Sequence, residues 1–149
     1  MIARRMRAGL AGAVLLAPLL TACAGGNDSY CDTVRSHQAE VGSAIRNGDP
    51  TGALQLLSAF QDLQDAAPDD VQDDYQLLVT RITALRTALD DAGVDPSSYD
   101  PQHPPAGVTP AERADIRQAA AELAAPDVAQ ALVSVQQEVL DVCHTPLGL

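Results

Sequence analysis

The sequence predicts an all-α protein, a small antiparallel bundle of four to five helices joined by a disulfide. Three observations lead to this prediction: apolar residues recur with helical spacing, proline and glycine mark the ends of these segments, and no segment alternates with a period of two. The chain has 149 residues, which fits one small domain, and 46% of them are hydrophobic, as in a globular protein.

The first 22 residues have the pattern of a bacterial signal peptide. Arg4, Arg5 and Arg7 form a positively charged start, and residues 10–20 form an apolar stretch that is too short to cross a bilayer as a helix. The adjacent arginines leave two export routes open, the general route and the twin-arginine route. We therefore predict that residues 1–22 are removed on export.

Leu20, Thr21, Ala22 and Cys23 form a lipobox, the site at which bacteria lipidate a cysteine and cleave the chain just before it. The small residues let the peptidase approach the backbone, and the Cys23 thiol takes a diacylglyceryl group. Two acyl chains of the palmitate kind anchor a protein stably, whereas one chain holds weakly. An ordinary secretory signal cleaved after Ala22 or Ala24 is the alternative. The sequence thus predicts a lipid-anchored protein on the extracytoplasmic face of the cell membrane, with no cofactor besides this covalent diacylglycerol.

The net charge excludes one class of function. The chain has 20 acidic and nine basic residues, all nine of them arginine, for a formal net charge of −11. Removal of the leader takes three arginines away and changes this charge to −14. Because such a surface repels phosphate backbones, we expect no nucleic-acid partner.

Cys31 and Cys143 remain in the exported part of the chain, where an oxidising compartment favours disulfides. They lie near the two ends of the folded body, so a bond between them would join the first helix to the last. No Cys-x-x-Cys pair supports a thioredoxin-like redox role. Free buried thiols and metal ligation are the alternatives, and the second lacks further ligands at suitable spacing.

The mature chain divides into a lipidated tether, 23–29, and a helical domain, 30–149. The predicted helices cover 30–47, 50–65, 68–92, 110–124 and 126–143. Ser29 is placed to cap the first of them, and Val34, Val41 and Ile45 give it an apolar face. This first helix is expected to end at Gly48.

Each of the other four helices has a proline at its predicted first turn, where the missing N–H costs nothing. These residues are Pro50, Pro68, Pro110 and Pro126. Thr109 and Glu112 also have the spacing of a capping box. Gly93 marks the end of the 68–92 helix, and Pro146 follows the end of the last one.

The Pro-rich segment 93–109 is predicted to be a linker within one domain, because neither half alone has enough helices for a core. Two topologies remain open. In the favoured one, this linker returns along the whole bundle, so that 110–124 and 126–143 form separate antiparallel helices. In the other, Pro126 only kinks one long final helix and no crossover is needed.

Candidate sites for chemistry are few. His37 has Glu40 at i+3, a spacing that suits a metal but is far commoner as a surface hydrogen-bonded pair. A disulfide would also bring one set of possible cation ligands together: Asp28, Asp32, Asp141 and His144. No nucleophile, zinc, phosphate-loop or dinucleotide motif is present, so we expect no catalytic residue, no resident metal and no enzyme activity.

The chain resembles the small envelope lipoproteins of actinobacteria, a group without an assigned function. The resemblance rests on the lipobox, Ser-Tyr-Cys at 29–31, Ala-Pro-Asp-Asp-Val at 67–71, Ala-Gly-Val-Asp at 92–95 and the closing Cys143. It implies an α-helical domain displayed outside the cell membrane and implies no catalytic residue.

These inferences give one main hypothesis for function. We expect a non-catalytic, lipid-anchored interaction or structural module that presents an acidic surface to an envelope protein or cell-wall partner. A binding protein for a small apolar ligand between the helices is the alternative, and it requires an apolar cavity of a few hundred Å³. Divalent-cation binding at the disulfide end is a third possibility.

Overall fold

The computed structural model describes residues 25–47, 52–97, 99–100 and 102–149, and this part of the chain is all-helical, as predicted. Its helices are α1 (Gly25–Asn47), α2 (Gly52–Gln55), α3 (Leu57–Ala66), α4 (Gln72–Asp91), α5 (Pro110–Leu123) and α6 (Pro126–Cys143). Within these ranges, no helix has the length and apolar character needed to span a membrane. The leader, the lipobox and Pro50 lie outside the described residues.

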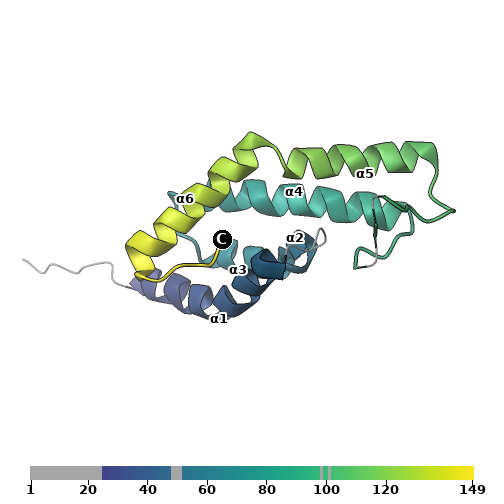
Figure 1. Ribbon diagram of the computed structural model, residues 1–149. Coiled ribbons are helices and arrows are strands. Elements are labelled where there is room, and N and C mark those ends of the chain that lie inside the picture. The colour runs from purple at the N-terminus through teal and green to yellow at the C-terminus, as the bar shows by residue number, and fades with distance from the viewer. Residues whose placement is uncertain (1–24, 48–51, 98, 101) are drawn as a thin grey trace, which may run out of the picture.

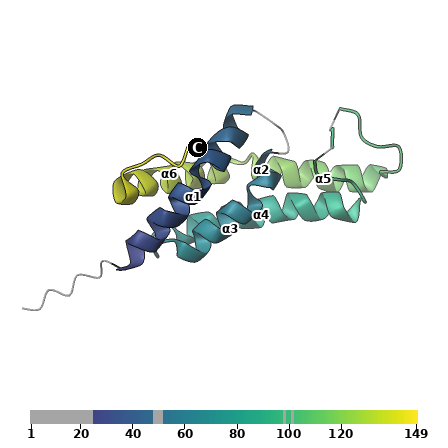
Figure 2. The same ribbon diagram turned by 90° about the horizontal axis from the view of Figure 1, so that it is seen from below.

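The helix α4 is the centre of the fold. It packs against α2, α3, α5 and α6, while α1 packs against α2, α3 and α6 (Figure 1). The pair of α4 and α5 extends to one end of the molecule, and α1, α3 and α6 gather at the other end (Figures 1 and 2). The core therefore lies mainly beneath α1, α3, α4 and α6, and α5 covers the far half of α4.

The predicted crossover of the linker is wrong. Arg81, in the middle of α4, reaches Glu122 at the end of α5 with an N–O distance of 2.7 Å and Asp127 at the start of α6 at 3.6 Å. Thus α5 runs antiparallel to α4, and the Pro-rich linker joins their neighbouring ends. Ala125 is extended (φ −72°, ψ 155°), so α5 and α6 are separate helices, and α6 then leads back to α1.

The start of α1 also differs from the prediction. The helix begins at Gly25 rather than at Tyr30, so residues 25–29 of the expected tether are helical. Ser29 is not an N-cap: its carbonyl accepts a hydrogen bond from Thr33 Oγ1 at 3.0 Å. Serine and threonine make such i−4 bonds inside helices, so a serine does not by itself fix a helix start.

The region predicted as the 50–65 helix is divided into α2 and α3 at Leu56, so the described residues form six helices where five were predicted. Pro68 does not open α4 either. It begins a turn in which the Val71 N–H donates to the Pro68 carbonyl at 3.2 Å, and α4 starts at Gln72.

Other predicted ends are confirmed. Thr109 Oγ1 accepts from the Glu112 N–H at 3.3 Å, and Glu112 Oε2 accepts from the Thr109 N–H at 2.7 Å, which completes the capping box. At the end of α4, Gly93 adopts φ +65°. The Val94 N–H then donates to the Leu89 carbonyl at 2.9 Å, as in a Schellman motif.

The disulfide between Cys31 and Cys143 is confirmed, with an S–S distance of 2.00 Å and a Cα–Cα distance of 5.3 Å. It joins the first third of α1 to the last residue of α6. Because the two cysteines are 112 residues apart in the chain, the bond closes almost the whole helical domain into one loop.

A short tail after α6 contributes to the core, which the sequence pattern did not indicate. Leu147 is fully buried, and Gln38 Nε2 on α1 donates to the Pro146 carbonyl at 2.6 Å. Gly148 adopts φ +98° and lies so close to α1 that a Cβ on it would come within 3.1 Å of the Gly42 Cα. The tail is therefore held against α1 by a buried leucine, a hydrogen bond and a close backbone contact.

Candidate functional site

A groove of about 490 Å³ lies between α4 and α5. Its α4 wall consists of Ala84, Thr87, Ala88 and Asp91, and its α5 wall of Glu112, Asp115, Gln118, Ala119 and Glu122. The alanines explain why the groove exists: short side chains on the facing ridges leave space between two packed helices. The groove is lined by four carboxylates and by no basic residue.

Two of these carboxylates are already engaged. Glu112 belongs to the capping box. The hydrogen bond that its carboxylate accepts from the Thr109 backbone N–H, with a smaller contribution from the Thr109 side chain, holds the pKa of Glu112 below the usual value. Glu122 binds the Arg81 guanidinium at 2.7 Å and accepts from Gln118 Nε2 at 3.2 Å. Both carboxylates therefore already have partners within the protein.

The other two, Asp91 and Asp115, are exposed. Within the described part of the chain, neither makes a hydrogen bond or an ion pair. An unpaired carboxylate on each wall gives the groove a negative charge that a bound cation can neutralise.

Arg81 anchors the inner end of the groove. Its two terminal nitrogens bind Glu122 and Asp127, whereas its Nε is buried without a hydrogen-bond partner among the described residues. The arginine therefore links α4 to the end of α5 and the start of α6. Carboxylates at this end of the groove thus already bind one guanidinium.

A second polar feature lies inside the core. The hydroxyls of Tyr30 on α1 and Tyr75 on α4 hydrogen-bond to each other at 2.8 Å, and both side chains are fully buried. Burial raises the pKa of Tyr30 to about 12, with a further contribution from the charge of Glu138, and burial raises the pKa of Tyr75 still more. Burial likewise raises the pKa of Glu138, together with the nearby charge of Asp70.

This pair predicts a loss of stability in alkali. The unfolded chain ionises its tyrosines near pH 10, whereas the folded chain keeps Tyr30 and Tyr75 neutral, so stability is complete below pH 10 and falls as the pH rises through 12. Tyr30 alone contributes a loss of about 2–3 kcal/mol by pH 12. Urea unfolding at several pH values measures this loss.

Two variants provide the comparison. Tyr30→Phe keeps the buried ring and removes the titrating hydroxyl, so its stability should depend less steeply on pH above pH 10. Tyr99→Phe, at a half-buried loop position, is the matched control for the loss of one tyrosine hydroxyl. Equal slopes in both variants would contradict this assignment.

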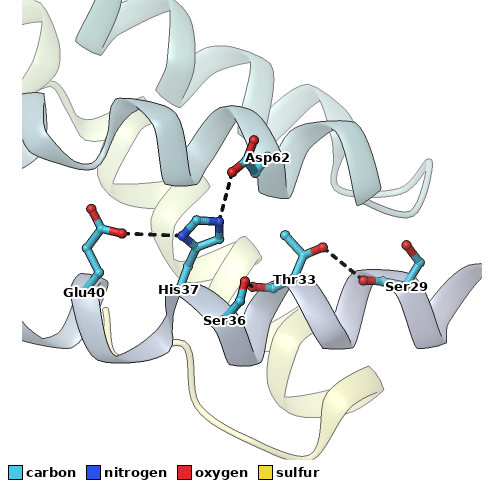
Figure 3. A network of polar contacts seen from close by, with 6 residues as sticks. All are labelled: Ser29, Thr33, Ser36, His37, Glu40 and Asp62. Carbon is cyan, nitrogen blue, oxygen red and sulfur yellow. Dashed lines mark hydrogen bonds and ion pairs between the residues drawn. The ribbon is translucent and has the colours of Figure 1, made fainter.

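His37 behaves as a hydrogen-bonded surface pair, with one partner more than predicted (Figure 3). Its Nδ1 lies 3.5 Å from Glu40 Oε2, and its Nε2 lies 3.1 Å from Asp62 Oδ2 on α3. Because each ring nitrogen faces a different carboxylate, the imidazole links α1 to α3. The neighbouring Ser36 hydroxyl donates to the Thr33 carbonyl at 2.7 Å and does not face the ring.

The possible cation site at the disulfide end does not form. Asp32 pairs with Arg35 at 3.1 Å, and Asp141 accepts from Gln137 Nε2 at 2.9 Å. Across the described ranges, no three histidine, cysteine or acidic side chains are grouped so that they could hold a metal ion. Asp28, Asp32, Asp141 and His144 therefore do not make one site.

Two hollows among the described residues bear on the alternative of an apolar ligand. The α4–α5 groove has a charged lining. A more apolar hollow of about 260 Å³ is lined by Leu132, Val133, Gln136, Gln137 and Leu149, but Val133 is 64% exposed there. This hollow is a shallow surface feature, unlike the enclosed sites that bind small apolar molecules.

Comparison with known proteins adds no assignment. No protein-family model, no curated protein and no solved structure matches this chain.

Proposed function

We propose that this protein is a lipid-anchored, non-catalytic interaction module on the extracytoplasmic face of a bacterial cell membrane, of the kind found among actinobacterial envelope lipoproteins. The lipobox ending at Cys23 supports the anchor, and the exported cysteine pair supports the location. The partner is an envelope protein or a component of the cell wall.

One structural observation carries the interaction role. The helix α1 begins at Gly25, two residues after Cys23, whereas the α4–α5 pair extends to the opposite end of the molecule (Figures 1 and 2). An anchor at Cys23 would hold the disulfide end near the membrane. The acidic groove between α4 and α5 would then face away from the lipid, where a partner can reach it.

The charge supports the same orientation. A mature chain with net charge −14 is repelled by anionic headgroups over a Debye length of about 8 Å at physiological salt. The helical domain should therefore stand off the headgroups rather than lie on them.

Replacement of the lipidated cysteine tests this proposal. In the native host, the wild-type protein should sediment with the membrane fraction, and Cys23→Ala should lose most of this association. Ser29→Ala, outside the lipobox, is the control and should stay with the membrane. The intact mass of each form shows whether residues 1–22 were removed, because a retained leader would hold the variant by another route.

The outcome that contradicts the anchor is also clear. If a Cys23→Ala protein that has lost residues 1–22 remains membrane-associated to the same extent as wild type, the lipid at this position is not what holds it.

A further inference from the structure

We propose that the α4–α5 groove docks a helical segment of a partner protein that carries arginine or lysine side chains. This inference rests on the proposed interaction role and names the chemistry of the partner. Two features of the groove identify this partner. Its carboxylates favour a positively charged segment, and the open space between α4 and α5 can take the side chains of a further helix.

The shape of the groove suits a helix. Among the described helices, α5 packs mainly against α4, and its buried residues are Ile116 and Ala119. Its carboxylates from Glu112 to Glu122 span about 15 Å along the axis. Alanines at the base of the groove allow close approach, so a third helix can lie along the pair with its side chains in the space of about 490 Å³.

The charges select a cation. Asp91 and Asp115, one on each wall, are unpaired within the described residues, and no basic side chain lines the groove to neutralise them. The protein already seats one guanidinium against this surface, since Arg81 binds Glu122 at 2.7 Å. A partner arginine would make the same contact with the free carboxylates.

Other occupants fit less well. A single metal ion needs several ligands that converge, and no such group exists in the described part of the chain. A second copy of this chain or an anionic lipid surface would bring more negative charge to a groove that is already acidic. An arginine-bearing or lysine-bearing helix satisfies both the shape and the charge.

The test uses the protein as isolated from its host and two synthetic probes. The first probe is an alanine-rich helical peptide with two arginines seven residues apart, about 10 Å along its axis. The second has glutamine in place of both arginines. Backbone amide shifts in nuclear magnetic resonance spectra report where each peptide binds. We expect the arginine peptide to shift amides lining the groove, from Ala84 to Asp91 and from Glu112 to Glu122, and the glutamine peptide to shift none.

Two double variants with equal changes of charge separate the groove from general attraction to an acidic protein. Asp91→Asn with Asp115→Asn should weaken binding of the arginine peptide about tenfold at low salt. Asp69→Asn with Asp73→Asn, at exposed sites outside the groove, should weaken it less than about twofold.

Three results would overturn the inference: no binding of the arginine peptide, equal weakening in the two double variants, or shifts centred on the apolar hollow at Leu132 and Val133. These results leave the anchor untouched, because membrane association through Cys23 is measured separately. Conversely, loss of the anchor assignment would not change where the peptide binds.

Discussion

Replacement of Cys31 and Cys143 together by alanine is expected to lower the free energy of unfolding by about 4–5 kcal/mol. The disulfide closes a loop across 112 positions of sequence, and a long loop restricts the unfolded chain strongly. It also fixes α6 against α1, which do not neighbour each other in the chain. Urea unfolding of the double variant and of the wild type, under oxidising conditions, measures the difference.

The reduced wild-type protein is the matched control for this prediction. It has lost the same covalent constraint and should approach the stability of the double variant. A double variant that loses less than about 1 kcal/mol would show that α1 and α6 are held together by packing alone.

Truncation of Leu147 is the second change with a large expected effect. Leu147→Ala should cost about 2–4 kcal/mol, because this side chain of the tail is fully buried and its removal leaves a cavity. The tail cannot easily close this cavity. Gly148 is already in close contact with the Gly42 backbone, and Pro146 is tied to Gln38 at 2.6 Å.

Leu140→Ala provides the comparison, since it makes the same chemical change on α6 at a side chain that is 40% exposed. It should cost less than about 1 kcal/mol. Thermal or urea unfolding of both variants gives the two values side by side. Equal losses would mean that the tail contributes no more to the core than a surface leucine does.

The parts of the fold that follow from local chemistry could be predicted from the sequence. The capping box at Thr109, the glycine stop at Gly93 and the helix start at Pro126 each depend on a few neighbouring residues, and all three are confirmed. The disulfide could be predicted for a different reason. It depends on the compartment and on having two cysteines left after the lipobox is assigned.

The features that depend on tertiary contacts could not be predicted. Ser29 has the chemistry of a cap, but the helix continues past it to Gly25. Pro68 is compatible with a helix start and with a turn, and in the structure it begins a turn. Leu147 follows a helix end and a proline, where sequence patterns indicate an exposed tail rather than a core residue.

The candidate site shows the same division. The sequence gives the number of acidic residues and the net charge, but it does not show which carboxylates face each other across two helices. What distinguishes Asp91 and Asp115 is the antiparallel pairing of α4 with α5, which places them on facing walls. That pairing depends on the path of the Pro-rich linker, and the predicted crossover placed it wrongly.

The central claim is that Cys23 anchors this helical domain to the membrane. Mass spectrometry of the N-terminal peptide, from the protein isolated in the membrane fraction of its native host, tests it most directly. We predict a peptide that begins at Cys23 and carries a diacylglyceryl group on its thioether, with or without a further acyl chain on the amine. A peptide that begins elsewhere, or that contains an unmodified Cys23, would contradict the claim.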